Sequence, residues 1–281
     1  MPPPVRALAT ANVNGVRAAT GKGLLDWLAV ADADAVCLQE VRARPEELPA
    51  ALTDALAAAG WHLRLAPCET AKGRNGVAVL SRSEPEAVRI GFGDPATDLD
   101  GRYLEVDLPG DLTVASLYLP KGVAGTDKQD AKDAFLKTFG DHLRTAFARC
   151  AATGREMVVA GDWNIAPTEQ DLRNWRNNQR NSGFLPHERE WFAGLLEHGW
   201  TDVVRALHPG TDGPYSWWTY RGRAFDNDVG WRIDHLLTTP GLAAAAHEAV
   251  VERAPSHDTR WSDHAPVVVR LGAGAPAGGT E

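Results

Sequence analysis

The sequence predicts an α/β fold with mixed β-sheets, and three observations support this class. Short apolar runs with strand composition alternate with segments whose apolar residues recur at helical spacing. The expected strands are short and separated by turn residues, which is typical of antiparallel or mixed sheets. No Pro/Gly/Ser-rich linker divides the 281 residues. We therefore expect one domain over residues 1–271, followed by a flexible low-complexity tail over 272–281.

The first half of the chain is expected to contain two helices among several strands. An apolar run over 5–13 predicts a strand that ends in an Asn-rich turn. The spacing of Leu24, Trp27 and Leu28 predicts a short helix over 21–31, and Pro45, which suits the first turn of a helix, predicts a second helix over 45–59. The other strands are expected at 35–38, 61–65, 76–81, 87–90, 103–107 and 112–119.

The second half is expected to begin with a long amphipathic helix. Its apolar residues, from Phe135 to Phe147, predict a helix over 128–151, and a buried strand follows over 157–160. The segment 163–190 is polar and rich in Asn and Arg, so we expect a long surface excursion there. The remaining expected elements are helices near 188–198 and from 240, and strands near 216–220, 233–238, 248–253 and 265–270.

Charge and cysteine content limit the class of protein. The net charge of −8 argues mildly against nucleic-acid binding, but acidic residues can hold cations, and arginines cluster locally over 173–180 and 221–232. The three cysteines lack metal-ligand spacing and are expected to be buried thiols. We find no secretory signal and no apolar run near the roughly 20 residues that cross a bilayer. We therefore expect a cytoplasmic protein with no membrane contact and, without a sustained apolar stripe, a monomer.

Polar clusters follow the ends of most of the apolar runs. They combine carboxylate, amide and imidazole groups, which bind hard metal ions and transfer protons. Gathered at one edge of a buried sheet, they would form the kind of site that metal-assisted phosphodiester hydrolysis requires. Taken singly, each cluster is also explained by turn, surface or core residues. The clusters are Asn12-Val13-Asn14-Gly15, Leu38-Gln39-Glu40, Tyr118-Leu119-Pro120, Gly161-Asp162-Trp163-Asn164, Trp231-Arg232-Ile233-Asp234 and Ser262-Asp263-His264-Ala265-Pro266.

With these motifs in this order between Val5 and Arg270, the sequence closely resembles the exonuclease III family of apurinic/apyrimidinic (AP) endonucleases. That family lies within the endonuclease/exonuclease/phosphatase superfamily. The resemblance implies a DNase I-like four-layer α/β sandwich, in which two mixed sheets pack face to face between helices. It also implies a site dependent on Mg²⁺ or Mn²⁺ that hydrolyses the DNA backbone 5′ to abasic sites and trims 3′ ends. Two further segments, 182–191 and 215–221, favour this DNA-repair branch.

The resemblance implies a metal centre around Glu40. Glu40 would be the primary ligand, since Mg²⁺ takes oxygen ligands and needs only one or two carboxylates. Asn12 and Asn14 would supply neutral oxygens or amide donors around the ion and the phosphate, and Asp263 would contribute to the same centre. The wider ligand set also includes Asp162, Asn164 and His264.

The same resemblance implies the catalytic groups. Asp162 and Asn164 lie two positions apart, so in an extended segment both side chains would point to the same face. Asp162 would accept a proton from the attacking water, and Asn164 would orient that water. His264, paired with Asp234, resembles the imidazole–carboxylate pair of the family and would act as a base or as a cation that stabilises the phosphate. Tyr118 would donate a hydrogen bond to the phosphate or to the leaving oxygen.

Substrate contacts are expected from aromatic and polar residues in the second half. Trp217, Trp231 and Ile233 match positions that line the pocket for a flipped-out abasic sugar, although core packing also explains them. An apolar pocket fits a deoxyribose without a base and excludes an intact nucleotide by its volume. Asn75 and Arg232 are expected to contact backbone phosphates.

One position departs from the family pattern. After Tyr118-Leu119-Pro120 the family often has Asn or Gln, whereas this chain has Lys121, which would meet a phosphate as a flexible point charge. The expected partner is duplex DNA with abasic sites or 3′ ends. Two alternatives stay open: a phosphatase or phosphodiesterase for small phosphorylated molecules or lipids, and a catalytically silent DNA-binding module. Also open are the balance of endonuclease, exonuclease and 3′-phosphatase activities, the number and type of metal ions, and the identity of the general base.

Overall fold

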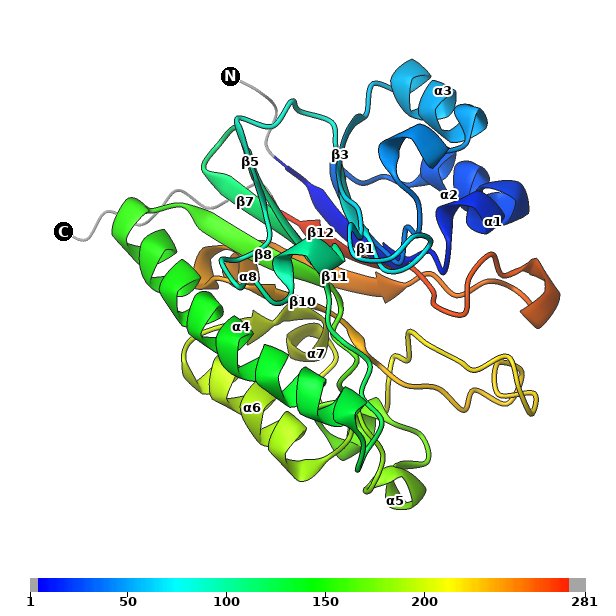
Figure 1. Cartoon of the computed structure of the whole chain (residues 1–281), viewed down its shortest axis with the longest axis vertical. Helices are drawn as coiled ribbons and strands as arrows, with labels where there is room; N and C mark the ends of the chain where they lie inside the picture. Colours follow the sequence, from blue (N-terminus) through cyan, green and yellow to red (C-terminus); the bar gives the residue numbers. More distant parts are fainter. Residues whose placement is uncertain (1–4, 273–281) are drawn as a thin grey trace.

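Two six-stranded β-sheets pack face to face in the computed structural model, which describes residues 5–272 (Figure 1). The first sheet combines the beginning and the end of the described chain, and the second contains the middle. From edge to edge, the first sheet contains β11 (Ala246–Val251), β12 (Val267–Leu271), β1 (Ala7–Asn12), β2 (Ala35–Gln39), β4 (Val77–Ser81) and β3 (His62–Ala66). The second contains β5 (Ala87–Ile90), β6 (Tyr103–Leu108), β7 (Leu112–Tyr118), β8 (Glu156–Asp162), β10 (Asp234–Thr238) and β9 (Thr201–Asp202).

Parallel pairing inside each sheet brings the polar strand ends together. β1 and β2 run parallel with Asn12 opposite Gln39, and β7 and β8 run parallel with Tyr118 opposite Asp162. β10 is antiparallel to β8, so its first residue, Asp234, also lies opposite Asp162. A hydrogen bond from Asn12 to Asp162 joins the two groups of strand ends across the sandwich.

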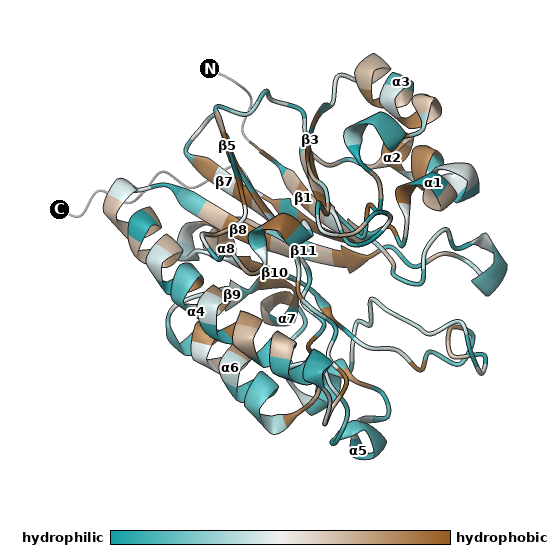
Figure 2. Cartoon of the chain, viewed as in Figure 1, coloured by the Kyte–Doolittle hydropathy of each residue, from teal (hydrophilic) through white to brown (hydrophobic). Residues whose placement is uncertain are grey.

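Helices cover the outer face of each sheet and complete four layers, as predicted. Apolar residues of η1, α2 and α3 pack on the first sheet, and those of α4 and α6 pack on the second. In Figure 2 the strands between these layers carry most of the hydrophobic colour, while the exposed side of α4 is largely hydrophilic. The helices are α1 (Val16–Ala19), η1 (Thr20–Leu24), α2 (Leu25–Val30), η2 (Pro45–Glu47), α3 (Ala50–Ala58), η3 (Asp98–Asp100), α4 (Asp127–Thr153), η4 (Glu169–Asp171), α5 (Trp175–Asn178), α6 (Pro186–Glu197), α7 (Val203–Leu207), α8 (Pro240–Ala245) and η5 (His257–Thr259).

The space between the sheets changes from apolar to polar along the strands. Leu8 on β1 and Val158 on β8 belong to one buried apolar cluster that both sheets share. Closer to the carboxyl ends, Thr10 donates a hydrogen bond to Gln39 at 3.1 Å, and Gln39 donates to Ser116 at 3.0 Å. These bonds satisfy polar groups that have no access to water. A layer of neutral, hydrogen-bonded side chains therefore separates the apolar core from the charged residues at the strand ends.

Three expected elements differ from the structure. The helix expected over 21–31 begins earlier, at Val16, and is interrupted at Gly23, whose φ of 125° lies outside the helical region. The helix expected over 45–59 is divided, because Pro49 disfavours the helical conformation at the residue before it, so η2 ends at Glu47 and α3 begins at Ala50. No strand forms over 216–220, where Trp217 makes only isolated bridges with Trp231 and His264.

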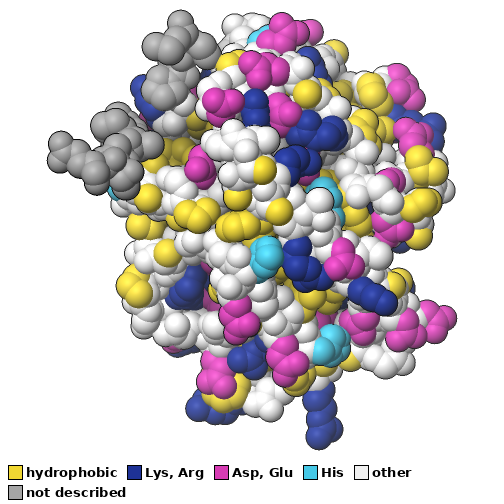
Figure 3. All heavy atoms as spheres, turned by 90° about the vertical axis from the view of Figure 1, so that its left-hand side faces the viewer, with side chains coloured by type: hydrophobic (Ala, Val, Ile, Leu, Met, Phe, Trp, Pro, Cys, Tyr) yellow, Lys and Arg dark blue, Asp and Glu magenta, His cyan; other side chains and the backbone are white. Residues whose placement is uncertain are grey.

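The prediction of buried thiols is confirmed. Cys37, Cys68 and Cys150 are free and buried. No helix within residues 5–272 has the length and apolarity needed to cross a bilayer. On the face shown in Figure 3, acidic and basic side chains are interspersed, without a broad patch of either sign. Residues 273–281 of the expected tail lie outside the described residues.

Candidate active site

Three of the expected site residues leave their strands through a left-handed backbone conformation. Asn14, Glu40 and Asn164 follow the ends of β1, β2 and β8 with φ angles of 46°, 50° and 49°. Asn tolerates this region because its short side chain hydrogen-bonds locally, whereas Glu pays a steric cost that is typical of functional sites. We expected Asn164 in an extended segment, and the structure instead places it in a left-handed turn. The turn after β8 nevertheless leaves both Asp162 and Asn164 facing one cavity.

Asn12 connects two carboxylates that come from different sheets. Its Nδ2 donates to Glu40 Oε1 at 3.0 Å and to Asp162 Oδ2 at 2.9 Å. Its Oδ1 accepts from the backbone amide of Asn14 at 3.0 Å. The guanidinium of Arg42 pairs with the other oxygen of Glu40. The position of Glu40 relative to Asp162 is thus held by a single buried amide.

Asp263 lies on the opposite side of this group. Its Oδ1 accepts from Asn14 Nδ2 at 2.7 Å, and its Oδ2 accepts from Trp217 Nε1 at 3.0 Å. Ser262 donates from Oγ to the carbonyl of Asn12 at 2.7 Å. The loop that precedes β12 is therefore fixed to the end of β1.

His264 is oriented by a buried carboxylate. Its Nδ1 donates to Asp234 Oδ2 at 2.8 Å, and the same oxygen accepts from Ser216 Oγ at 2.6 Å. This leaves His264 Nε2 pointing toward the cavity, 3.7 Å from Asp162 Oδ2. A carboxylate on one ring nitrogen fixes the orientation of the imidazole and favours its charged form.

Burial and neighbouring charges set the protonation of these groups. Burial raises the pKa of Asp162 to about 7; His264 opposes this shift, and Asp234 and Glu40 add to it. Burial alone would lower the pKa of His264, but Asp234 and Asp162 raise it to about 10. Burial, together with the nearby Glu40 and Asp162, raises the pKa of Tyr118 well above its ordinary value. At neutral pH the imidazole is a cation, Tyr118 is a neutral donor, and Asp162 is ready to exchange a proton.

These groups open into one cavity of about 220 Å³. One wall is apolar: Trp217 and Trp231 meet edge to face, with ring centres 6.3 Å apart, and Ile233 lies beside them. The cavity therefore combines acidic and imidazole groups with an aromatic wall. It is lined by Glu40, Tyr118, Lys121, Asp162, Asn164, Asn181, Ser182, Gly183, Trp217, Trp231, Ile233, Asp263 and His264.

The donor set of this cavity fits a divalent cation. Glu40, Asp162 and Asp263 present carboxylates to it, and the described lining includes no cysteine, so hard cations are favoured over soft ones. Three carboxylates confined in one cavity repel each other, and a bound cation relieves that repulsion. His264 fits the ligand set less well than expected, because its Nδ1 is bound to Asp234 and its ring is cationic.

Comparison with known proteins identifies the family. Residues 9–264 match the Endonuclease/Exonuclease/phosphatase family. The chain belongs to this family. DNA repair nuclease APEX1 of Danio rerio is 34% identical to it over 260 residues, which cover 92% of this chain and 80% of the relative. Exodeoxyribonuclease of Bacillus subtilis is 32% identical over 257 residues, which cover 91% of this chain and 95% of the relative.

Solved structures of similar proteins confirm the four-layer fold. An AP endonuclease from Archaeoglobus fulgidus matches with a TM-score of 0.84 at 28% identity, over 95% of this chain and 99% of that one. The 3′–5′ exonuclease NExo from Neisseria meningitidis matches with a TM-score of 0.83 at 30% identity, over the same shares of 95% and 99%. The family member described here therefore keeps both sheets and their helical layers.

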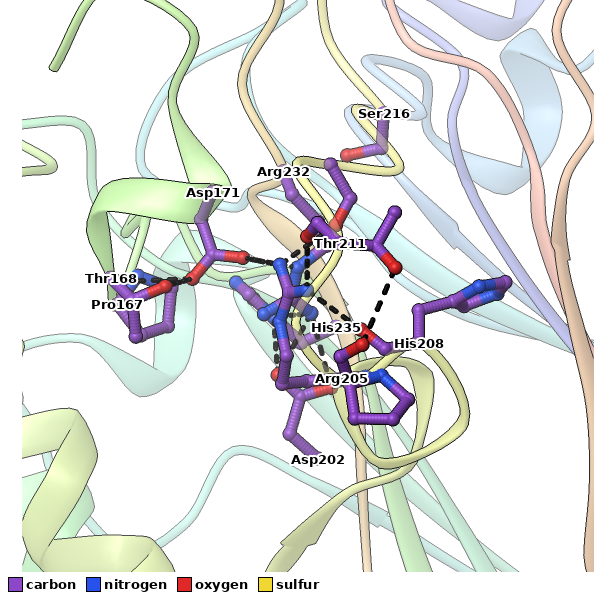
Figure 4. Close-up of polar contacts among 12 residues, drawn as sticks. Pro167, Thr168, Asp171, Asp202, Arg205, His208, Thr211, Ser216, Arg232 and His235 are labelled. Atoms are coloured by element: carbon purple, nitrogen blue, oxygen red, sulfur yellow. Dashed lines mark hydrogen bonds and ion pairs between the residues drawn. The ribbon is translucent and has the colours of Figure 1, made fainter.

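The expectation that Arg232 contacts a backbone phosphate is wrong. Its side chain is 1% exposed and lies in a network of polar contacts with Asp171, Asp202 and His235 (Figure 4). Its Nε lies 2.7 Å from Asp171 Oδ1, and its Nη1 lies 2.8 Å from Asp202 Oδ2. His235 joins the network through Arg232 Nη1 at 2.9 Å and donates from Nε2 to the carbonyl of Ile165 at 2.8 Å. Arg232 thus braces the segments on both sides of the site, and its buried guanidinium has almost no surface to offer a phosphate.

The other two expected phosphate contacts have different environments. Lys121 lines the cavity, with Nζ 5.4 Å from the centre of the Trp217 ring. Asn75 lies outside the cavity lining; its Nδ2 donates to the carbonyl of Asp100 at 3.1 Å, and its own carbonyl accepts from the amide of Arg42 at 2.8 Å. A phosphate contact by Asn75 stays a prediction.

Three residues with direct roles in the site were not identified from sequence. Arg42 pairs with Glu40, Ser216 supports Asp234, and Ser262 anchors the end of β1. Ser262 lies inside one of the polar clusters, so its position gave a usable signal. Ser216 lies in the singled-out segment 215–221, but its pairing with Asp234 depends on how two segments 18 residues apart pack. Arg42 lies only two residues after Glu40, so its pairing was open to local reasoning.

Proposed function

We propose that this protein is a DNA-repair phosphodiesterase that hydrolyses the backbone of duplex DNA 5′ to abasic sites and removes nucleotides or blocking groups from 3′ ends. The observation that carries the proposal is that one cavity contains a proton-accepting carboxylate, a cationic imidazole and an aromatic wall. Asp162 supplies the base, His264 the cation, and Trp217 with Trp231 the wall. The relatives named as DNA repair nuclease and exodeoxyribonuclease support the same reaction class.

Asp162 is the group best suited to activate water. Its pKa of about 7 lies close to neutral pH, where a general base is most effective. As water attacks phosphorus in line with the leaving oxygen, Asp162 accepts the proton and Asn164 orients the water. The bond from phosphorus to the 3′ oxygen of the upstream nucleotide breaks, leaving a 3′ hydroxyl and a 5′ phosphate. No covalent intermediate with the protein is needed.

His264 and Tyr118 act on the phosphate as it gains negative charge. The imidazole of His264 is already cationic, which supports stabilisation of the phosphate over proton abstraction. Tyr118 keeps its hydroxyl proton at neutral pH and donates a hydrogen bond to the phosphate or to the leaving oxygen. This division makes Asp162 the base and His264 the electrostatic group.

We further propose Mg²⁺ or Mn²⁺ as the cofactor. Glu40 and Asp263 would hold the ion, with Asn12 and Asn14 beside them, and the ion would neutralise charge on the phosphate. Arg42 keeps one oxygen of Glu40 in an ion pair. Glu40 therefore has a fixed orientation and leaves its second oxygen toward Asn12 and the cavity.

The aromatic wall supports recognition of an abasic sugar. Trp217 is held by its hydrogen bond to Asp263, and Trp231 by the backbone bridge to Trp217. A rigid apolar wall receives a deoxyribose without a base and resists a larger nucleotide by its volume. Lys121, above the Trp217 ring, adds a positive charge to the cavity lining.

A fluorescent duplex with one tetrahydrofuran abasic analogue tests the proposal, with Mg²⁺ or Mn²⁺ and separately with EDTA. The analogue cannot undergo β-elimination, so any cut is hydrolytic. We expect one EDTA-sensitive cut 5′ to the analogue, together with shortening from the 3′ end. Absence of cleavage with either metal would contradict the proposal. Hydrolysis of a soluble phosphomonoester would then favour the small-substrate alternative, and tight DNA binding alone would favour the binding module.

We also propose that the protein acts in the cytoplasm as a monomer built from one domain. The exposed large apolar side chains support the monomer, because they are distributed over separate elements, such as Val30 on α2, Ile90 on β5 and Leu196 on α6. Size-exclusion chromatography with light scattering tests this state. A stable dimer in solution would contradict it.

A further inference from the structure

A fully buried ion pair lies directly behind the cavity. Lys132 on α4 and Glu188 on α6 each have 0% side-chain exposure, and Lys132 Nζ lies 2.8 Å from Glu188 Oε1. Burial lowers the pKa of Lys132, and the charge of Glu188 opposes that shift. Removing two charges from water is costly unless further hydrogen bonds satisfy them. The bonds that do so reach the residues that line the cavity.

Lys132 holds the backbone of the loop after β8. Its Nζ donates to the carbonyl of Asn164 at 2.9 Å. The amide nitrogen of Asn164 donates to Asp162 Oδ1 at 2.9 Å, and Asn164 Nδ2 donates to the carbonyl of Leu119 at 2.9 Å. Three polar groups of Asn164 are therefore occupied, and its side-chain Oδ1 remains for the cavity. Asn164 also has a φ of 49°, a conformation that needs such external support.

Glu188 holds the segment 183–185, which forms a second wall of the cavity through Gly183. Its Oε2 accepts from the backbone amides of Gly183 at 2.6 Å and Leu185 at 3.1 Å. Gly183 packs so closely that a Cβ there would lie 3.0 Å from the carbonyl oxygen of Asn164 and 3.3 Å from the Trp231 ring. This second wall therefore packs closely against both Asn164 and Trp231.

We propose that Lys132 and Glu188 form a positioning unit for the reaction, which aims the Asn164 side chain at the attacking water and supports the wall behind Trp231. The proposal rests on the proposed function. Neither residue lines the cavity, so both act through other residues: through backbone groups and through Ser182, whose Oγ donates to Glu188 Oε1 at 3.1 Å. A misplacement of about 1 Å in a group that orients a reactant lowers the rate by up to about 100-fold.

A metal site at this place does not fit the contacts. Asp133, His187 and Glu188 bring ligand atoms close together. However, the oxygens of Glu188 already accept from backbone amides and from the ammonium of Lys132, which repels a second cation. Asp133 and His187 form a more exposed pair at 3.0 Å, with side chains 40% and 51% exposed. Gln129 links this pair to Glu188, since its Nε2 donates to Asp133 at 2.8 Å and to Glu188 at 3.0 Å. This pair joins the same two helices without touching Asn164, so it provides a matched control.

The test is a double-mutant cycle on the full-length protein. The combined change Lys132→Met and Glu188→Gln removes both charges with little change of volume, and Gln keeps an acceptor for the backbone amides of the wall. Asn164→Gly removes the side chain that the unit is proposed to aim, and Gly suits the positive φ. Each variant is measured for kcat and KM on the tetrahydrofuran duplex, with circular dichroism and thermal unfolding to establish folding. His187→Gln is the control.

We expect the paired change to lower kcat at least about tenfold in the parent, with KM nearly unchanged, and by less than about threefold in the Asn164→Gly background. His187→Gln should leave kcat unchanged. Equal losses in both backgrounds, or an unchanged kcat in the folded paired variant, would overturn the proposal. If the paired variant does not fold, Glu188→Gln alone is put through the same cycle, with the same non-additivity expected.

A crystal structure of the folded variant separates this proposal from the proposed function. The Asn164 side chain should be displaced by about 1 Å or more in the paired variant but not in His187→Gln. If the parent protein fails to cut DNA, the proposed function is wrong, and the position of Asn164 still decides the positioning claim. An undisturbed Asn164 would overturn that claim whatever the activity.

Discussion

Substitution of Asp162 by Asn tests the assignment of the general base. Asp162 Oδ1 accepts from the amide of Asn164 at 2.9 Å, and Oδ2 accepts from Asn12 Nδ2 at 2.9 Å and faces His264 Nε2 at 3.7 Å. A side-chain amide keeps the first bond. Its NH₂ group then points at the Asn12 donor and at the cationic imidazole. The change therefore removes the proton acceptor and one hydrogen bond while the volume of the side chain is kept.

The expected loss follows from the role of the carboxylate. Loss of a positioned base lowers the rate by at least about 100-fold, which corresponds to about 2.7 kcal/mol of activation free energy. KM should change little, because the aromatic wall of Trp217 and Trp231 is untouched. The pH profile should change as well. The base must be deprotonated, so kcat of the parent should fall as the pH drops through about 7 and below, and the variant should lack this decrease.

Single-turnover cleavage of the tetrahydrofuran duplex with Mg²⁺, measured from about pH 5.5 to about 9, gives both quantities. Asp141→Asn is the control, because Asp141 is a carboxylate on α4 whose side chain is 66% exposed. A loss below tenfold for Asp162→Asn, or an acid decrease that persists in the variant, would refute the assignment of the base.

Three further predictions follow from the same contacts. His264→Ala should lower kcat by at least about 100-fold. The fall of the remaining activity at acidic pH should also move to higher pH, because His264 lowers the pKa of Asp162. If this fall stays at the same pH, His264 does not influence the protonation of Asp162. Trp231→Ala should reduce abasic cleavage more than 3′ exonuclease activity on undamaged ends. An equal loss of both activities would show that Trp231 serves core packing and not recognition of the abasic sugar. Arg232→Met should lower the free energy of unfolding by about 3–5 kcal/mol, since it leaves buried Asp171 and Asp202 short of a cation. Urea denaturation measures this free energy, and Arg173→Met is the exposed control. If Arg232→Met instead reduced the salt dependence of DNA binding by a slope of about 1, Arg232 would contact a phosphate after all.

Residues at strand ends were the most predictable part of the site. Asn12, Glu40 and Asp162 end or directly follow short apolar runs, and such runs form strands whose ends meet when the strands are parallel neighbours. The order of the motifs along the chain predicted the fold through resemblance to a known family. The position of each side chain at the edge of its own sheet could therefore be anticipated, whereas the meeting of Asn12 with Asp162 depends on the packing between the sheets.

Helix interruptions and irregular segments were less predictable. Gly23 interrupts one expected helix and Pro49 divides another, and both residues were visible in the sequence, so local conformational rules could have found these breaks. The segment 216–220 has strand-like composition but forms only isolated bridges, because Trp217 instead packs against Trp231 and binds Asp263. Composition reports a local preference, and tertiary contacts decided the outcome there.

Local sequence was enough to indicate which chemical groups stand at the strand ends, because a strand end and its turn are set by residues that are neighbours in the chain. The sequence also determined the family, through the order of its motifs. Packing between distant segments decides which groups line the cavity and which support them from behind. Arg232 lies between two cavity residues in the chain yet turns into a buried network, and Lys132 reaches Asn164 from a helix 32 residues away. Burial and charge pairing act through space, so these roles become visible only when the sheets and helices are packed together.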